Sequence, residues 1–542
     1  MLPRGESYDE LIERFRWNIP GFYNIGADVC DRWADNDPDR VALVITGERS
    51  DARNITYNEL KSCSNRFANL FAAHGLEPGD RIGILLPQSP ETAFAHIAAY
   101  KMGAIAVPLF TLFGPEALEY RLANSGARML VTDTGGAAKI AGIRDALPAL
   151  ETVFIVDGPS SGCIGLRDEA QKQSDRFAPV RTRADNPALI IYTSGTTGPP
   201  KGALHAHRTL LGHLPGVEMS HDLFPQAGDR IWTPADWAWI GGLIDVLLPA
   251  LHHGVPVVAR RFDKFSGEAA FQLIQDHGVR NAFLPPTALK MMRAVPEPRK
   301  RWKLDMRSIA SGGETLGAEL LDWGREIFGV TINEFYGQTE CNMIVSSCGA
   351  VMQPRPGIMG RPVPGHELAI VSSEGERLPD GTLGNIAVKR PDPVMFLEYW
   401  DNPGATREKF TGDWLLTGDK GMRDEQGWLR FVGRDDDVIT SSGYRIGPGE
   451  IEDCLIGHPS VSMAGVVGVP DEERSEIVKA FIVLDDNVEG TEALTEEIRQ
   501  WVRTRLAAHE YPREIEFVDE LPLTATGKII RNELRKRDRQ KG

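Results

Sequence analysis

Short apolar runs alternate with segments of helical periodicity in the first part of the chain. Four runs rich in Val, Ile and Leu have the length of strands, at 81–86, 104–110, 128–133 and 152–157. The segment 91–102, between the first two runs, predicts a helix. Strands that alternate with helices are typical of βαβ units, which build parallel sheets.

The same alternation returns in the middle of the chain. A second group of apolar runs predicts strands at 188–193, 255–260, 279–286 and 331–337. Two separate groups of runs favour two stacked α/β subdomains over one continuous sheet. The predicted fold class is therefore α/β.

From about residue 365 the pattern changes to short apolar segments separated by Gly, Pro and Asp turns, which predicts a small β-barrel-like subdomain. A run of three aspartates, 435–437, then precedes a glycine-rich stretch, and we place a hinge there. The rest of the chain predicts a compact α+β lobe that ends in a basic helix or tail. We therefore predict an N-terminal domain of residues 1–434 and a mobile C-terminal domain of residues 435–542.

Charge and cysteine usage exclude several classes of protein. The 60 basic and 76 acidic residues give a net charge of −16, whereas a nucleic-acid-binding protein usually presents a basic surface. The six cysteines are scattered without a CxxC pair, which favours free thiols in a reducing compartment. The first residues lack the apolar core of a signal peptide, and no apolar run reaches the roughly 18 residues of a membrane span. We expect a cytoplasmic protein without a nucleic-acid partner or a membrane span.

The strongest chemical signal is the segment Tyr192–Gly202, YTSGTTGPPKG, which follows an apolar run. Its glycines and hydroxyl side chains expose many hydrogen-bond donors, and this composition suits a loop that cradles phosphate oxygens. It is not a Walker A loop, because Gly202 stands where that motif requires Ser or Thr. The predicted phosphate-binding residues are Thr193, Ser194, Gly195, Thr196, Thr197, Gly198 and Lys201.

This loop resembles the phosphate loop of the adenylate-forming superfamily, which includes acyl-CoA synthetases, luciferases and the adenylation domains of peptide synthetases. Further segments resemble the other blocks of the superfamily in the same order: 55–60, 101–108, 311–315, 336–340, 414–419, 433–445 and 523–528. Together they span nearly the whole chain, and they look most like medium-chain acyl-CoA ligases. The resemblance implies an enzyme that converts a carboxylic acid and ATP to acyl-AMP and pyrophosphate. It then transfers the acyl group to coenzyme A, so ATP, Mg²⁺ and coenzyme A are the implied cofactors.

The resemblance also implies three catalytic residues. Thr339 is expected to contact phosphate and Glu340 to hold Mg²⁺, which prefers hard oxygen ligands such as a carboxylate. Glu340 follows a predicted strand end, where open α/β sheets place their ligands. Lys528, beside Gly527, is expected to neutralise charge while the carboxylate of the acid attacks the α-phosphate.

The remaining nucleotide and coenzyme A contacts are implied in the same way. A carboxylate at Asp419 can accept both ribose hydroxyls, and Arg434 can reach the same sugar. The C-terminal domain is expected to rotate about Asp436 between the two steps, which withdraws Lys528 and presents a loop to coenzyme A. The expected coenzyme A contacts are Ser442, Gly443 and Tyr444. The expected nucleotide contacts outside the phosphate loop are Gly313, Glu314, Glu334, Phe335, Tyr336, Gly337, Gln338, Asp419, Arg434 and Arg445.

The predicted acyl pocket is formed by Trp239, Ile240, Gly241, Gly312 and Gly337. Acetate-specific relatives carry Trp where this chain has Gly337, and Thr and Val where it has Gly241 and Gly312. Three glycines in place of bulky residues predict room for several methylenes, and each buried methylene contributes about 0.8 kcal/mol. We therefore predict a preference for medium-chain or aryl acids over acetate, unless Trp237 or Trp239 fills the space.

Other residues that could carry chemistry favour structural roles. His205, His207 and His213 follow the phosphate loop at near-helical spacing, and without a nearby acidic or cysteine ligand we favour packing or a helix face over metal binding. The tryptophans at 232, 237 and 239 favour core packing, although the superfamily places this region beside the acyl pocket. Glu510 stands where many relatives carry a lysine, which leaves the coenzyme A contact on that side open.

Three other functions stay open at this point. A peptide-synthetase module is expected to carry a carrier domain after the lysine block, and only residues 529–542 follow Lys528. A light-emitting oxygenase has no positive support from the sequence. A relative that only binds nucleotide is expected to have lost Glu340 or Lys528, and this chain has both. An adenylating enzyme that transfers the acyl group to another acceptor is the main alternative.

A substitution at Gly443 tests the coenzyme A assignment. Glycine lets a ligand approach the backbone closely, so Gly443→Leu is expected to obstruct the thiol's path. ATP–pyrophosphate exchange should continue at the wild-type rate, while thioester formation should stop. Acyl-CoA formation at the wild-type rate would place the path of coenzyme A elsewhere.

Overall fold

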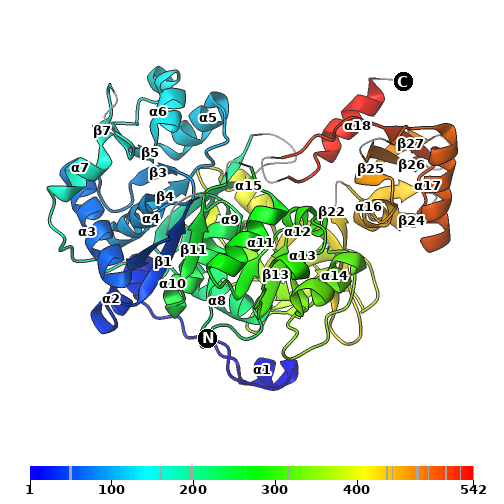
Figure 1. Ribbon diagram of the computed structural model, residues 1–542, viewed down its shortest axis with the longest axis horizontal. Coiled ribbons are helices and arrows are strands. Elements are labelled where there is room, and N and C mark those ends of the chain that lie inside the picture. Colours follow the sequence, from blue (N-terminus) through cyan, green and yellow to red (C-terminus); the bar gives the residue numbers. More distant parts are fainter. Residues whose placement is uncertain are drawn as a thin grey trace.

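The computed structural model describes the chain except for residues 48–51, 159–160, 194–198, 263, 314–315, 435–436, 442–443, 472–474, 486–487, 507–509, 525–526 and 541–542. The described residues form four sheets, and the first two carry most of the α/β architecture. In Figure 1 these two sheets and their helices form the body of the molecule, coloured blue to yellow-green.

The first sheet has eight strands in the order β19-β9-β8-β4-β3-β5-β6-β7. Its central strands are parallel and joined by helices, as the alternation of apolar and helical segments predicted. The strands are β3 (Arg81–Leu85), β4 (Ile105–Pro108), β5 (Met129–Thr132), β6 (Thr152–Ile155), β7 (Ile164–Gly165), β8 (Pro187–Thr193), β9 (Lys201–Ala206) and β19 (Glu398–Tyr399). The neighbouring helices are α3 (Tyr57–Ala73), α4 (Pro90–Met102), α5 (Pro115–Ser125), α6 (Thr134–Ala141) and α7 (Leu166–Gln171).

The second sheet has nine strands in the order β16-β15-β14-β13-β12-β10-β11-β1-β2. Its strands are β1 (Val41–Thr46), β2 (Arg53–Thr56), β10 (Ile231–Trp232), β11 (Val257–Arg260), β12 (Asn281–Phe283), β13 (Ser308–Gly312), β14 (Ile332–Gln338), β15 (Cys341–Ser346) and β16 (Arg361–Pro362). The helices between them are α8 (Thr209–Ser220), α9 (Ile240–Gly242), α10 (Leu248–His253), α11 (Gly267–Asp276), α12 (Pro286–Arg293), α13 (Pro298–Arg301) and α14 (Ala318–Phe328). Two separate sheets confirm the predicted pair of α/β subdomains.

Two smaller sheets follow in sequence. The third is antiparallel and contains β17 (Leu368–Val371), β18 (Gly384–Lys389), β20 (Phe410–Thr411), β21 (Trp414–Arg423) and β22 (Leu429–Arg434). The fourth contains β23 (Ile439–Ser441), β24 (Tyr444–Ile446), β25 (Val461–Asp471), β26 (Ser475–Leu484) and β27 (Glu514–Phe517). Its helices are α16 (Pro448–Ile456), α17 (Glu492–Arg505) and α18 (Arg531–Arg539), and Figure 1 shows this lobe in orange and red beside the body.

Helix α4 illustrates how the sequence sets the elements of the body. The Ser89 side chain accepts the Thr92 N–H, Pro90 begins the helix, and Gly103 ends it with a φ of 71°. The helix is buried on all sides, so even Lys101 is 0 % exposed. A buried cation is tolerated when it is paired, and Lys101 Nζ lies 2.6 Å from Asp31 Oδ1.

The histidines after the phosphate loop are packed in the core, which confirms the first of the two structural roles expected for them. His205 lies in β9, His213 lies in α8, and both are buried together with His207. Strand β9, residues 201–206, pairs with β8 and β19. Among the described residues, no group of three His, Cys, Asp or Glu side chains could hold a metal ion. No described helix combines the length and apolar composition needed to cross a membrane.

Candidate active site

The phosphate loop connects two antiparallel neighbours in the first sheet. Strand β8 ends at Thr193 and β9 begins at Lys201, and these two residues are partners in the ladder. The predicted contacts Ser194, Gly195, Thr196, Thr197 and Gly198 lie outside the described residues. The structure therefore fixes both ends of the loop, with Lys201 at its exit.

Thr339 and Glu340 form the two-residue turn between β14 and β15, because Gln338 and Cys341 are ladder partners. Glu340 is 6 % exposed, and its carboxylate accepts a hydrogen bond from the hydroxyl of Tyr399. The carbonyl oxygen of Glu340 accepts the Phe396 N–H at 2.8 Å. No local motif marks Tyr399 as a site residue, because its contact with Glu340 spans 59 residues.

Lys201 reaches the same place from the phosphate loop. Its Nζ lies 5.3 Å from the centroid of the Tyr399 ring. The backbone of Thr339, in the turn, forms a hydrogen bond with the buried His205. Burial is the main cause that lowers the pKa of His205 to about 3. A neutral imidazole therefore packs beside the turn. Lys201, a predicted phosphate contact, and Glu340, the predicted metal ligand, both contact Tyr399.

Asp419 lies beside Arg434, its ladder partner on the neighbouring strand β22. The Tyr336 hydroxyl donates to Asp419 Oδ2 at 2.5 Å, and Arg434 Nε lies 3.9 Å from Asp419 Oδ1. Burial raises the pKa of the Asp419 carboxyl, while Arg434 and the Tyr336 hydrogen bond oppose that rise. Two predicted nucleotide contacts from different sheets, Tyr336 and Asp419, are thus joined directly.

Gln338 and Glu334 occupy the same strand, β14. Gln338 Nε2 donates to the Thr417 carbonyl at 3.0 Å, and its Oε1 accepts from Lys409 Nζ at 2.9 Å. Glu334 is 6 % exposed, and burial raises the pKa of its carboxyl well above the usual value; Asp453 of α16 adds to the rise. The predicted contact Glu314 lies outside the described residues.

The lysine turn of the C-terminal lobe reaches the large domain. Figure 1 shows the segment before α18 extending from the lobe toward the body. A Cβ placed on Gly313 would lie 3.8 Å from Lys528 Cε and 3.7 Å from the Trp239 ring. The charge of Lys528 also lowers the pKa of Asp419. The structure therefore brings Lys528, Gly313, Trp239 and Asp419 together.

Several predicted residues of the lobe are not placed. Asp436, Ser442 and Gly443 lie outside the described residues. The side chains of Tyr444 and Arg445 are also outside them, although the backbone of both residues belongs to β24. The hinge and the coenzyme A loop remain predictions.

The free space expected at three glycines of the acyl pocket requires correction. A Cβ at Gly337 would lie 2.5 Å from the backbone of both Asn342 and Met343, so Gly337 faces strand β15 and not open space. A Cβ at Gly241 would lie 2.8 Å from the rings of Phe283 and Trp239. Each glycine therefore permits close packing of a neighbour, and a tryptophan at position 337 would displace β15.

Three aromatic rings occupy this region. The centroids of Trp239 and Phe283 are 5.7 Å apart, and those of Phe283 and Phe335 are 5.2 Å apart. A Cβ at Gly312 would lie 2.7 Å from the Phe335 ring. Ile240 is buried at the start of α9. Phe335 was expected to contact the nucleotide. Phe283 was not predicted as a site residue, because it lies in a short strand without a motif.

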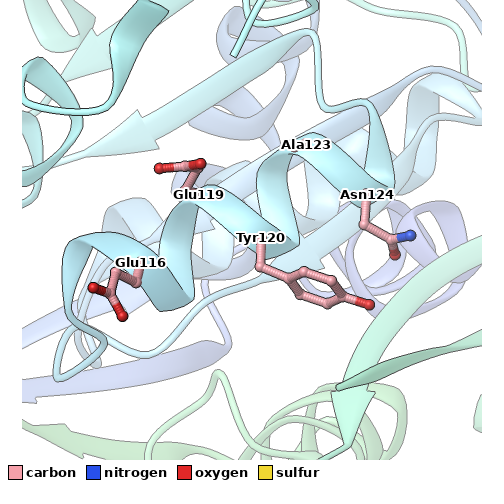
Figure 2. A pocket seen from close by; sticks show the side chains of 5 residues that line it. All are labelled: Glu116, Glu119, Tyr120, Ala123 and Asn124. Carbon is pink, nitrogen blue, oxygen red and sulfur yellow. The ribbon is translucent and has the colours of Figure 1, made fainter. Parts of the chain in front are cut away.

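A hollow of about 420 Å³ runs along helix α5 and is lined by Glu116, Glu119, Tyr120, Ala123 and Asn124 (Figure 2). Figure 2 shows Tyr120 and Asn124 pointing to the same side of the helix. The Tyr120 hydroxyl donates to the Pro200 carbonyl at 2.9 Å, so the hollow borders the exit of the phosphate loop.

Residues 30–400 match the family described as AMP-binding enzyme, and residues 450–528 match the AMP-binding enzyme C-terminal domain. The chain is 37 % identical to the acetyl-coenzyme A synthetase of Bacillus subtilis over 98 % of this chain and 95 % of that one. It is 34 % identical to the mitochondrial acyl-coenzyme A synthetase ACSM3 of Mus musculus over 98 % of this chain and 93 % of that one.

A solved structure supports the same assignment. The anthranilate CoA ligase AuaEII, in complex with anthranoyl-AMP, superposes with a TM-score of 0.88. It shares 30 % sequence identity and covers 96 % of this chain and 98 % of its own. Because family models match residues 30–400 and 450–528 and the relatives align with nearly the whole chain, the chain belongs to the AMP-binding enzyme family and is an AMP-forming acyl-CoA synthetase that uses ATP, Mg²⁺ and coenzyme A.

Proposed function

We propose that this acyl-CoA synthetase activates medium-chain or aryl acids at a site between Trp239, Gly313 and Lys528. The main observation in support is that Lys528 Cε lies close to Gly313, beside the ring of Trp239. The rings of Trp239, Phe283 and Phe335 form an apolar cluster, with interplanar angles of 37° and 53°, and apolar rings suit an aryl or alkyl group. The similar protein AuaEII is an anthranilate CoA ligase, while a Bacillus subtilis relative is an acetyl-coenzyme A synthetase, so small acids are the competing class.

In the first half-reaction the chain's own groups orient the acid and ATP. Lys528 is proposed to bridge the acid's carboxylate and the α-phosphate, so its charge offsets the negative charge that gathers as the P–O bond to pyrophosphate breaks. Thr339 and the donors of residues 193–201 are proposed to hold the phosphates. Positioning of the carboxylate in line with the leaving pyrophosphate is proposed to add to the acceleration.

Glu340 is the proposed magnesium ligand, and its surroundings fit that role. It offers a carboxylate oxygen at a strand turn, and no cluster of three acidic, histidine or cysteine ligands lies within the described residues. A single protein carboxylate is typical of Mg²⁺ that arrives with ATP and keeps phosphate and water ligands. When bound, Mg²⁺ neutralises phosphate charge.

Asp419 is proposed to accept the ribose hydroxyls. Its Oδ2 already accepts the Tyr336 hydroxyl, and Arg434 approaches its Oδ1, so the carboxylate is held from two sides. Rotation about Asp436 is proposed to bring Gly443 to the site for thioester formation. A division after Arg434 is supported by the described strands, since β22 and β23 belong to different sheets. The scattered cysteines favour a cytoplasmic setting.

Replacement of Lys528 tests the proposed first half-reaction. Lys528→Ala should lower ATP–pyrophosphate exchange by about 100-fold or more, because removing one preorganised charge from a transition state has that effect. Formation of acyl-CoA from supplied acyl-AMP should stay within a few-fold of wild type. Lys536→Ala, a lysine of α18, serves as the charge-matched control. Equal losses in both half-reactions would contradict the assignment.

Removal of the Tyr336 hydroxyl tests the ribose site. The hydrogen bond from Tyr336 lowers the pKa of Asp419, so Tyr336→Phe should raise that pKa further. Because the ionised carboxylate is the better ribose acceptor, the rise of KM for ATP at acid pH should begin at a higher pH than in wild type. If the pH dependence of KM for ATP is the same in Tyr336→Phe as in wild type, Asp419 does not take part in ATP binding.

The substrate class is tested with a panel of acids. Pyrophosphate release should be faster with hexanoate, octanoate and benzoate than with acetate at equal concentration, because a larger apolar group packs more surface against the rings of Trp239, Phe283 and Phe335. Coenzyme A and a non-CoA thiol should be compared as acceptors in the same assay. A wild-type enzyme that prefers acetate to hexanoate would overturn the proposed acid class while leaving the adenylation chemistry intact.

A further inference from the structure

Tyr399 contacts two charged residues of the proposed adenylation site, yet no motif in the sequence marks it. Its hydroxyl donates to Glu340 Oε1, and its ring lies against Lys201 Nζ, 5.3 Å from the centroid. Both Tyr399 and Glu340 are almost fully buried, at 4 % and 6 % exposed. The tyrosine therefore connects the carboxylate of the β14–β15 turn to the lysine at the exit of the phosphate loop.

The backbone around Tyr399 is fixed on both sides. It lies in β19, where Tyr399 and Ala203 of β9 are ladder partners. The Tyr399 N–H donates to Thr406 Oγ1 at 3.0 Å, and the Trp400 N–H donates to the Gly202 carbonyl at 2.7 Å. Strand β9 begins at Lys201, so the backbone at the exit of the phosphate loop belongs to the strand that pairs with β19 and Tyr399.

The chemical consequence concerns the two oxygens of Glu340. A buried carboxylate without a hydrogen-bond donor is costly, and the Tyr399 hydroxyl satisfies Oε1. This hydrogen bond restrains the carboxylate, and within the described residues it is the one hydrogen bond that reaches the Glu340 side chain, so Oε2 is the oxygen proposed for a cation. The ring face meanwhile contacts Lys201. The Lys201 ammonium and the Glu340 carboxylate therefore contact different atoms of the Tyr399 side chain.

We propose that Tyr399 is a positioning residue that orients Glu340 toward the magnesium–nucleotide complex. The inference rests on the proposed role of Glu340 as the magnesium ligand. Groups that hydrogen-bond a metal ligand set its orientation, and their loss typically weakens metal affinity by 10- to 100-fold. Tyr399 acts through Glu340 and does not touch the reacting atoms.

The test is Tyr399→Phe, which removes the hydroxyl and keeps the ring beside Lys201. Binding of Mn²⁺·ATP, measured by electron paramagnetic resonance without acid or coenzyme A, should weaken by about ten-fold. The Mg²⁺ concentration that gives half-maximal pyrophosphate exchange should rise by a similar factor. Thioester formation from supplied acyl-AMP should not change, because that step uses no magnesium-bound triphosphate.

Tyr57→Phe is the matched control. The Tyr57 side chain is 0 % exposed, and its hydroxyl donates to the Leu251 carbonyl at 2.9 Å, in a part of the fold without predicted site residues. It loses one buried hydroxyl hydrogen bond, as Tyr399→Phe does, but should keep wild-type Mn²⁺·ATP affinity. Equal weakening in both variants would mean a general loss of packing and would overturn the proposal.

Glu340→Gln separates this inference from the proposed function. If Glu340→Gln weakens Mn²⁺·ATP binding and Tyr399→Phe does not, the positioning role is wrong and the magnesium assignment stands. If Glu340→Gln has no effect, the magnesium assignment itself fails. Adding Tyr399→Phe to Glu340→Gln should cause no further loss of affinity, because the tyrosine acts through the carboxylate.

A second variant covers the case in which Tyr399→Phe does not fold. Thr406→Val removes the acceptor of the Tyr399 N–H while it keeps the tyrosine hydroxyl. It should weaken Mn²⁺·ATP binding in the same direction by a smaller factor. Wild-type affinity in Thr406→Val, with Tyr399→Phe unfolded, would contradict the proposal.

Discussion

The site depends on supplying each of three buried carboxyl groups with a hydrogen-bond donor. Glu334, Glu340 and Asp419 are each less than one-tenth exposed and lie along or beside strand β14. Each has its own donor: the backbone of Leu316 for Glu334, the Tyr399 hydroxyl for Glu340, and the Tyr336 hydroxyl for Asp419. Burial favours the neutral acid, which binds ribose hydroxyls less well, and the donors of Glu334 and Asp419 oppose the rise in pKa without cancelling it.

The cation that complements these carboxyls comes from another part of the chain. Lys528 belongs to the lobe, and it lies beside Gly313 and within the electrostatic reach of Asp419. Asp453 of the same lobe raises the pKa of Glu334, and a Cβ on Gly317 would lie 3.6 Å from the Asp453 carboxyl carbon. The lobe therefore brings both favourable and unfavourable charges to the large domain. An arrangement held by such opposing terms would suit the domain movement that we propose between the two steps.

The glycines near the acyl wall show why a missing side chain does not imply free space. Gly337 faces the backbone of β15, and Gly241 is packed against Phe283 and Trp239. Protein interiors are packed to crystal-like density, so a neighbouring ring or strand moves into the volume that glycine vacates. Which neighbour does so depends on the ladder register of β12 to β15 and on side chains that are distant in sequence.

The sequence by itself determined the fold class, the family and the chemistry that the blocks encode, because βαβ periodicity and donor-rich loops are local patterns. It predicted the helix 91–102 to within one residue of α4 and found the strands of both α/β subdomains that carry continuous apolar runs. Only the tertiary structure decided that residues 201–206 form a strand, that Tyr399 contacts Glu340, and that aromatic rings or a neighbouring strand fill the space beside the glycines. Those three features depend on strand pairing and on side-chain packing between distant segments, and no local pattern in the chain records either.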